Sequence, residues 1–417
     1  MVSQPIPSMR QFDILLNKAR ARTWSEKPKI PRFSVREFVS GLIMPTLTNI
    51  ANAVKAAALD AGFELAGVAS IASCEEVEHY PEWIAKGYAG DMKYLEARDA
   101  QGRLKRASLQ HVAPWARSVV VCAINYNTAE PYSTARSDPD RGWISRYAWS
   151  REDYHDAVLR KLRIVEAKLR SFAVESRTAT NGEIECVDIL GTGPSDEFRS
   201  MCYVDTGPLV ERVYAKYAGV GWIGKNTCII NQKMGSWLFL GVILTSLELE
   251  PDLPAPDRCG TCTRCIEACP TNAFVGPHEL DASRCISYLT IEKRGSIPED
   301  LREDMGRHVF GCDICQDVCP WNRKAPATTA PEFQARDRLV NPALDWLTEM
   351  NTHEFRETFR GSPVKRAKLQ GLRRNALIAM GNSGERKFIP MLEKLLAEED
   401  NVIAEAAGWA MDKLKSS

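Results

Sequence analysis

The segment from Cys259 to Cys319 constrains the fold of this chain more than any other part of the sequence, because it holds eight of the 13 cysteines. It opens with four cysteines spaced C-x2-C-x2-C-x3-C-P. Chains that hold two 4Fe–4S clusters use this spacing, and the fourth cysteine of the run then ligates the second cluster. A shorter run that begins with Cys312 and Cys315 also ends in Cys-Pro. The segment therefore predicts an iron–sulfur domain with two clusters.

The crossing of the fourth cysteine assigns a set of ligands to each cluster. The ligands of cluster one are then Cys259, Cys262, Cys265 and Cys319. Those of cluster two are Cys269, Cys312 and Cys315, and a fourth ligand is still needed because the second run lacks its first cysteine. Cys285 lies between the two runs and is the obvious substitute.

Two other kinds of cysteine site compete with this interpretation. A pair of four-thiolate zinc sites also uses short C-x2-C steps, but the rhythm x2, x2, x3 followed by Cys-Pro is far more specific for clusters. A disulfide framework is not favoured in a chain of 417 residues without a secretory signal. The remaining cysteines lack ligand-like spacing and are expected to be buried structural thiols. They are Cys74, Cys122, Cys186, Cys202 and Cys228.

Length and charge set only broad limits. The 417 residues are enough for two to four domains of roughly 100–200 residues each. The 54 basic and 54 acidic side chains balance, so only local clusters of charge can indicate a nucleic-acid partner. No apolar run reaches the roughly 18 residues of a membrane-spanning helix, and no secretory signal is found. We therefore expect a cytoplasmic protein, where the thiols stay reduced.

The hydrophobic pattern predicts a multidomain α+β protein. Helix and strand signals alternate over residues 46–250, which predicts an α/β domain, with α+β as the alternative. The elements expected in it are a helix from Leu47 that ends at Gly62, strands at 64–70, 119–126, 201–205 and 237–247, and a long helix at 153–172.

Proline-rich segments at 251–256 and 325–331 lie on either side of the cysteines, which predicts a ferredoxin-like domain over residues 251–330. Residues 331–417 predict a HEAT-like helical domain. Its expected amphipathic helices are 368–380, 385–397 and 402–414. Because fewer than about three repeats are marginally stable alone, this domain should pack on the rest of the chain.

Two segments do not fit these domains. Residues 1–45 are basic and contain several prolines, and we expect a flexible extension there, with an RNA-binding tail as the alternative. Residues 173–200 are rich in Gly, Ser and Thr and are expected to form a surface loop.

The run from Gly219 to Asn226 matches the pattern G-x-G-x-x-G and nearly matches G-x4-G-K-[ST]. Both nucleotide-binding patterns require a strand before the loop and a helix after it. Here a helix is expected at 209–218 and a strand-like segment follows. We therefore interpret these glycines as a helix end and a tight turn.

Several longer motifs accompany the cysteines. They are Ser145-Arg-Tyr-Ala148, Asp153-Tyr-His155, Val204-Asp-Thr-Gly-Pro208 with Glu211-Arg212, Ala218-Gly-Val-Gly-Trp-Ile-Gly-Lys-Asn226, Arg284-Cys-Ile-Ser-Tyr-Leu-Thr290 and Cys319-Pro-Trp-Asn322. With these motifs the chain resembles the epoxyqueuosine reductase family over residues 46–415. The string Arg-Cys-Ile-Ser-Tyr-Leu-Thr between two cysteine runs is the most specific of them.

This resemblance implies an enzyme that reduces epoxyqueuosine to queuosine at the wobble position of tRNA. It implies that residues 46–250 bind cobalamin, which is reduced through the two 4Fe–4S clusters. The partners it implies are tRNAs with a GUN anticodon and an unidentified low-potential electron donor; we expect a monomer without membrane contact. The alternative is a related, dehalogenase-like reductase of a small molecule, but such enzymes carry an export signal and lack the helical tail. A non-catalytic electron carrier would leave residues 46–250 unexplained.

Asp205 is the first candidate for the acid that protonates the opened epoxide. It follows a predicted strand and precedes a predicted helix, a place where side chains point into clefts. Its alternative roles are to cap a helix that starts at Pro208 or to pair with Arg212. Asp153 is the second candidate, and its alternative role is likewise a helix N-cap.

The family resemblance also suggests which residues contact cobalamin. They are Arg106, Arg146, Asp153, Asn226, Ser287 and Asp313. The two arginines have surface salt bridges as their alternative. Asp313 lies between two predicted cluster ligands, which would place cobalamin beside cluster two. His155 is expected to form hydrogen bonds on a helix face and not to ligate a metal.

A cluster of basic residues near the C-terminus is the candidate surface for RNA. Its members are Arg356, Arg360, Lys365, Arg366, Lys368, Arg373 and Arg374. The alternative is an ordinary solvated helix face.

Overall fold

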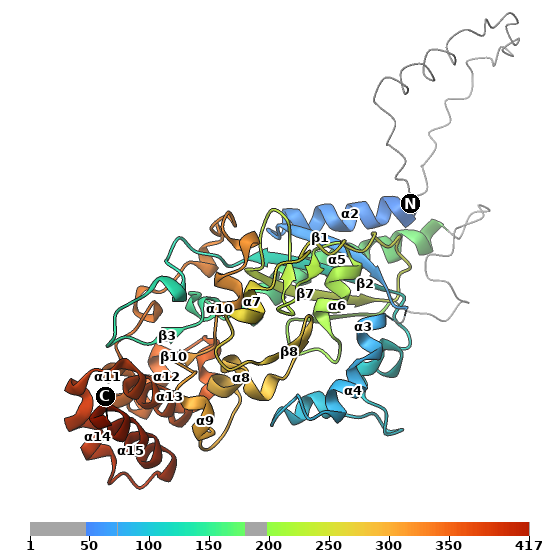
Figure 1. The fold of residues 1–417 in the computed structure, drawn as a ribbon. Coiled ribbons are helices and arrows are strands. Elements are labelled where there is room, and N and C mark those ends of the chain that lie inside the picture. Colours follow the sequence, from blue (N-terminus) through green and yellow to red (C-terminus); the bar gives the residue numbers. More distant parts are fainter. Residues whose placement is uncertain (1–46, 73, 180–197, 417) are drawn as a thin grey trace, which may run out of the picture. The chain divides into compact units, whose positions relative to one another are not determined.

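The computed structural model describes residues 47–72, 74–179 and 198–416 (Figure 1). Segment 1–45 and most of segment 173–200 lie outside the described residues, so the predictions made for them stay untested. The contacts group Pro45–Ser417 as one compact unit. No helix in the described part of the chain is long and apolar enough to cross a membrane.

A four-stranded sheet forms the centre of the first half of the described chain. Its strands, in the order in which they pair, are β1 (Leu65–Ser70), β2 (Ser118–Asn125), β7 (Leu238–Thr245) and β4 (Ser200–Tyr203). Every residue of β2 is buried. The apolar, β-branched sequence of this strand suits a central position that is covered on both faces.

Helices cover both faces of this sheet. They are α2 (Leu47–Asp60), α5 (Tyr154–Ala179) and α6 (Glu211–Tyr217). Because side chains alternate along a strand, Val120 and Cys122 of β2 pack with α2 and α5, whereas Val119 and Val121 pack with α6. Figure 1 shows these helices beside the strands of the sheet.

The direction of the strands differs from the α/β prediction. All three ladders of the sheet are antiparallel, so this region is α+β. Neighbouring parallel strands need a crossover, usually a long helix. In its described residues, the connection from β1 to β2 instead contains short helices, among them α3 (Glu75–Glu78) and α4 (Tyr80–Ala85), three 3-10 helices and irregular segments.

The local predictions around glycine are confirmed. Gly62, with a φ of +88°, follows α2 and ends it in a left-handed conformation. Gly219, with a φ of +70°, follows α6 in the same way. The hairpin of β5 (Trp222–Ile223) and β6 (Ile229–Ile230) comes next, which confirms a tight turn and not a phosphate-binding loop. The long helix α5 continues to Ala179, past its predicted end.

The cysteine segment consists of short elements. They are α7 (Arg264–Glu267), β8 (Phe274–Gly276), β9 (Glu279–Leu280), α8 (Ile286–Ile291), α9 (Glu299–Arg302), β10 (His308–Phe310) and α10 (Ile314–Asp317). Helices α7 and α10, which lie within the first and the second cysteine run, contact each other. Strand β10 pairs in parallel with β3 (Trp143–Ile144), which belongs to the preceding region.

The C-terminal part of the described chain is helical. Its helices are α11 (Leu344–Glu349), α12 (Thr352–Thr358), α13 (Lys368–Ser383), α14 (Ile389–Leu395) and α15 (Asn401–Ser416). Helix α13 lies at the centre and packs against α11, α15 and β10. The three amphipathic helices predicted here are therefore confirmed, whereas their HEAT-like character stays a prediction.

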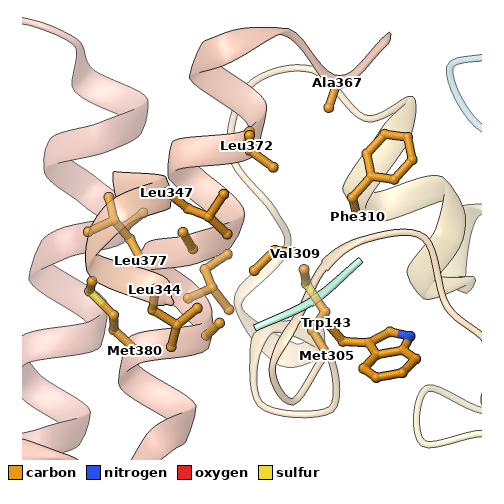
Figure 2. Packing of buried hydrophobic residues seen from close by; sticks show 14 of the residues in the cluster. Trp143, Met305, Val309, Phe310, Leu344, Leu347, Ala367, Leu372, Leu377 and Met380 are labelled. Carbon is orange, nitrogen blue, oxygen red and sulfur yellow. The ribbon is translucent and has the colours of Figure 1, made fainter. Parts of the chain in front are cut away.

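One hydrophobic core crosses the predicted domain boundaries. It contains Trp143 and Ile144 of β3, Val309 of β10, and Leu372 and Leu377 of α13. Figure 2 shows Trp143, Val309 and Leu372 in this cluster. Three segments that are far apart in the sequence thus share a core, and the boundaries at residues 250 and 330 stay predictions.

Candidate functional site

The four cysteines predicted to bind cluster one line a single pocket. Cys259, Cys262 and Cys265 come from the first run and Cys319 from the second. Gly260, with a φ of +53°, allows the tight turn between the first two of them. Burial, and then the neighbouring thiolate of Cys259, raises the pKa of Cys265. The structure therefore brings the first predicted ligand set together.

The four cysteines predicted to bind cluster two also lie within electrostatic range of one another. Burial raises the pKa of Cys312 well above its usual range, and the thiolates of Cys285 and Cys269 raise it further. The pKa of Cys315 is also raised well above its usual range. The hydrogen bond with Cys228 and burial are the main causes, and the charges of Cys312 and Cys285 raise it further. Cys285 therefore lies where the missing fourth ligand is needed.

Two residues of the β5–β6 hairpin region lie between the cysteine groups. Asn226 lines the pocket of the first group and donates from Nδ2 to the carbonyl oxygen of Cys315 at 3.2 Å. Cys228 hydrogen-bonds with the thiol of Cys315, which lowers the pKa of Cys228 against the effect of burial. Cys228 was predicted only as a structural thiol, because sequence spacing does not reveal its contact with a cluster ligand.

Asp205 lies on an exposed loop before α6. Helix α6 begins at Glu211, with Val210 as its N-cap residue, so Asp205 does not cap it. The guanidinium of Arg212 donates to the carbonyl oxygen of Thr227 at 3.1 Å. Asp205 has a left-handed φ of +59°, and 69% of its side chain is exposed. Its carboxylate is therefore accessible to a substrate.

Two tyrosines connect Asp205 with the second cysteine group. The hydroxyl of Tyr154 donates to Asp205 Oδ2 at 2.9 Å. Burial, and then the charge of Asp205, raises the pKa of Tyr154 well above its usual value, so the hydroxyl keeps its proton. The ring of Tyr154 packs edge-on against Tyr147, at 6.0 Å between centroids. Tyr147 in turn lies beside Gly311, the residue before Cys312.

His155 lies between the two candidate acids. Its Nδ1 is 2.7 Å from Asp153 Oδ1, and its Nε2 is 4.0 Å from Asp205 Oδ2. Burial alone would raise the pKa of Asp153, but hydrogen bonds from the ring and backbone of His155 outweigh it and lower that pKa. Asp153 also caps the first turn of α5 by accepting from His155 N at 3.1 Å. Tyr154 and His155 belong to a motif that the sequence indicated, yet only the structure shows their contacts with Asp205.

Glu211 is a buried carboxyl group that the sequence placed in a family motif without a role. Burial, and then the negative charge of Asp205, raises its pKa to about 8. The backbone N–H of Asp205 donates to it. Its Oε1 is buried and has no hydrogen-bond partner among the described residues. The motif did not indicate that this carboxyl group is buried next to Asp205.

Two of the residues predicted to contact cobalamin lie near these groups. Arg106 donates to the carbonyl oxygens of Tyr94 and Gly207, both at 2.8 Å, and Gly207 belongs to the loop that carries Asp205. Ser287 lies in the first turn of α8 and hydrogen-bonds with the thiol of Cys285. Arg106 therefore lies near the loop of Asp205, and Ser287 lies near the second cysteine group.

Arg146 and Asp313 have internal partners that differ from the prediction. Asp313 is 1% exposed and accepts hydrogen bonds from Trp143 Nε1 at 3.0 Å, from Arg146 N at 2.8 Å and from the hydroxyl of Ser145. Arg146 is also 1% exposed. Its guanidinium donates to Thr128 and to the carbonyl oxygens of Glu130 and Pro131. The surface salt bridge considered for Arg146 does not fit this burial, whereas the cofactor contacts predicted for Arg146 and Asp313 stay predictions.

Six of the seven residues of the C-terminal basic cluster separate into two groups in the structure, and the seventh, Arg366, is exposed and pairs with Glu292. Arg374 is buried and donates to the carbonyl oxygens of Leu289, Lys293 and Gly295. Arg373 pairs with Glu398 at 3.0 Å. These two arginines hold α13 in place. The basic residues that line an open hollow next to α12 are Arg356, Arg360, Lys365 and Lys368.

Two family models match the chain. The model described as a 4Fe-4S double cluster binding domain matches residues 258–322. The model described as Epoxyqueuosine reductase QueG, DUF1730 matches residues 106–184. The first match contains both cysteine groups, and the second contains Arg106, Asp153 and His155.

Curated relatives match 89% and 88% of the chain. The epoxyqueuosine reductase of Xanthomonas campestris pv. campestris is 36% identical over 374 residues, which are 89% of this chain and 98% of that protein. The epoxyqueuosine reductase of Pseudomonas aeruginosa is 35% identical over 373 residues, 88% of this chain and 95% of that protein. A crystal structure of epoxyqueuosine reductase with a tRNA-Tyr epoxyqueuosine-modified stem loop has a TM-score of 0.74 and 29% identity, and covers 88% of this chain and 91% of that one.

Proposed function

The chain belongs to the epoxyqueuosine reductase family, and we propose on this basis that it reduces epoxyqueuosine to queuosine at the wobble position of tRNA. The observation that carries the proposal is the match over 98% of the Xanthomonas relative, in a chain that gathers both predicted cysteine groups. The curated relatives named above share one activity in their names, which favours tRNA as the substrate over the small-molecule alternative.

Removal of an epoxide oxygen requires two electrons and two protons. For the electrons we assign a 4Fe–4S cluster to each cysteine group, because the thiolates of each group lie within range of one another. Cluster two then lies nearer to Asp205, through Gly311, Tyr147 and Tyr154. Cluster one lies beside Lys225 and Arg264 at the pocket, where an electron donor can approach.

Cobalamin is the cofactor we propose between cluster two and Asp205; when bound, it supplies a strongly reducing cobalt centre. The residues present fit a polar cofactor in this region. The buried Oε1 of Glu211 and two guanidinium nitrogens of Arg336, a neighbour of Asp153, have no partner among the described residues. The contacts we propose are Arg106, Asp153, Asn226 and Ser287. Arg146 and Asp313 also support the site from within the core, and their contacts with cobalamin stay predictions.

Asp205 is the proposed acid for the epoxide oxygen. Its carboxyl group is exposed on a loop with left-handed backbone, and Tyr154 holds one of its oxygens. An acid in this position must reach an incoming substrate, which a buried carboxyl such as Asp313 does not. Asp153 takes a different role, because its carboxylate is engaged by His155.

The hollow lined by Arg356, Arg360, Lys365 and Lys368 is the proposed contact for the tRNA backbone. These four side chains of the basic cluster face solvent, as does that of Arg366, which pairs with Glu292 outside the hollow. Further proposals follow from family membership alone: tRNAs with a GUN anticodon, a HEAT-like C-terminal domain, a monomer in the cytoplasm, and a separate low-potential electron donor.

The direct test is conversion of the modified nucleoside. Protein reconstituted with iron, sulfide and cobalamin is incubated with a strong reductant and tRNA that carries epoxyqueuosine. The tRNA is then digested, and its nucleosides are analysed by mass spectrometry. We expect a product that has lost one oxygen, and no product without cobalamin. Intact epoxyqueuosine after incubation with fully loaded protein would contradict the proposed function, and product without cobalamin would contradict the cofactor.

A further inference from the structure

Each turnover of the proposed reaction takes up two protons, because the epoxide oxygen leaves as water. Asp205 carries one proton at a time, so it must be reprotonated before the reaction is complete. The neighbours of Asp205 therefore need to include a group that delivers a proton and recovers it from solvent.

His155 has the geometry for this delivery. Its Nε2 lies 4.0 Å from Asp205 Oδ2, a distance that one bridging water or a small rotation of the side chain spans. Its Nδ1 lies 2.7 Å from Asp153 Oδ1. An ionised carboxylate is only an acceptor, so Nδ1 carries the hydrogen and Nε2 is the nitrogen that exchanges a proton with Asp205.

Packing holds the ring in this orientation. The imidazole stacks on the ring of Tyr154 at 4.0 Å between centroids. Tyr154 donates to the same Asp205 oxygen that faces His155. Asp153 is fixed by the backbone N–H of His155, and the charge of Arg336 also acts on it. The charged and titratable groups around the imidazole are therefore Asp153, Asp205 and Tyr154, with Arg336 behind Asp153.

Access to solvent distinguishes His155 from Glu211, the other titratable neighbour of Asp205. The side chain of His155 is 34% exposed, so its ring exchanges protons with water. Glu211 has a buried oxygen without a partner, and the backbone N–H of Asp205 donates to its carboxyl group. Glu211 therefore contacts the backbone of Asp205 and lies away from bulk water.

We propose that Asp153 and His155 form a proton relay that recharges Asp205 from solvent between the two proton transfers of one turnover. This inference rests on the proposed function. In the relay, protonated Nε2 gives its proton to the Asp205 carboxylate and the ring becomes neutral, with Nδ1–H still donated to Asp153. Nε2 then takes a proton from water. No electrons move in this step, and the charge lost by the ring neutralises Asp205. His155 acts through Asp205 and is a positioning residue.

Replacement of His155 tests the relay. His155→Gln keeps a polar side chain but cannot carry a proton, and we expect turnover to fall about 10²–10⁴-fold, the usual contribution of acid–base groups. Turnover of His155→Ala should fall by a similar factor. Added imidazole should restore it, at a rate that changes with the pKa of substituted imidazoles. His79→Ala, at an exposed histidine before α4, is the matched control and should stay unaffected.

The outcomes separate the relay from the proposed function. If wild-type protein makes no queuosine, the proposed function fails. If it does, and His155→Gln matches wild type or imidazole fails to rescue His155→Ala, the relay is overturned. A readout without cofactors uses NMR: the His155 ring signals, identified by their loss in His155→Gln, should shift in both Asp153→Asn and Asp205→Asn. If the ring signals of His155 do not shift in Asp205→Asn, the relay is also overturned.

Discussion

Two aspartates of similar standing in the sequence occupy opposite environments in the structure. Asp313 is 1% exposed and accepts from Trp143, Ser145 and Arg146. The side chain of Asp205 is 69% exposed and accepts from Tyr154. The first lies at the centre of a buried polar network between β3 and the second cysteine run. The second lies on an open loop with left-handed backbone.

The difference teaches which carboxylate is available for chemistry. A buried carboxylate whose oxygens already accept three hydrogen bonds stabilises the fold, because its donors would otherwise be unpaired. An exposed carboxylate with a single side-chain donor contributes little to folding and is free to exchange a proton. Substitutions at the two positions should therefore affect different properties: stability at Asp313 and turnover at Asp205.

The largest effect is expected for Asp205→Asn. The amide keeps the shape of the side chain and tolerates the left-handed backbone, but it cannot donate an acidic proton. We expect turnover of epoxyqueuosine tRNA to fall about 10²–10⁴-fold. The free energy of unfolding should change by less than about 0.5 kcal/mol, since the side chain is exposed. Single-turnover product formation measures the change in turnover, and thermal unfolding measures the change in stability. Full turnover by Asp205→Asn would show that Asp205 is not the acid.

Asp313→Ala should mainly lower the stability of the protein, in contrast to Asp205→Asn. It leaves three buried donors without an acceptor, and each costs about 1–3 kcal/mol. We expect the free energy of unfolding to fall by about 3–5 kcal/mol in denaturant titrations. Asp313→Asn is the matched control, since its amide oxygen still accepts from Trp143 and Arg146 while the hydroxyl of Ser145 can turn to accept, so its cost should be about 1 kcal/mol. Equal stability of the two variants would contradict the network.

The cysteine groups were predictable from the sequence because a cube requires its ligands at fixed short spacings. Cys285 was predictable by elimination, since the second run lacks one thiol. The strands were predictable as well: β2 and β7 are apolar runs of the expected length. Their direction was not, because a strand buried on both faces reads as the same continuous apolar run in parallel and antiparallel sheets.

The rest of the candidate site was less predictable because a sequence motif does not show which of its side chains are buried. Arg106 and Arg146 were both predicted as cofactor contacts, yet one lies beside the Asp205 loop and the other is buried among carbonyl oxygens. Arg374 looked like part of a basic surface and is buried. The contact of Glu211 with Asp205 is seen only in the folded structure. Each of these assignments depends on contacts between residues far apart in the sequence.

Arg146→Lys should have a smaller effect on the buried network. The guanidinium bridges Thr128, Glu130 and Pro131, and it lies 4.9 Å from the ring centroid of Trp149. An ammonium group cannot span this set of acceptors or stack in the same way. We expect a loss of about 2 kcal/mol in the free energy of unfolding. Arg106→Lys, at the open site, should cost less than about 0.5 kcal/mol; a similar cost at both positions would contradict the distinction between the two regions.

The smallest effect is expected for Tyr154→Phe, which removes one hydrogen bond to Asp205 and keeps the ring that stacks on His155 and packs on Phe239. A tenfold fall in rate corresponds to a loss of about 1.4 kcal/mol of transition-state stabilisation. Because Asp205 is held by this bond on an otherwise exposed loop, turnover should fall about tenfold through poorer positioning, with stability nearly unchanged. Single-turnover rates beside denaturant unfolding measure both. If stability fell and turnover stayed, the hydroxyl of Tyr154 would belong with Asp313 and Arg146 among the groups that support the fold, and another residue would have to orient Asp205.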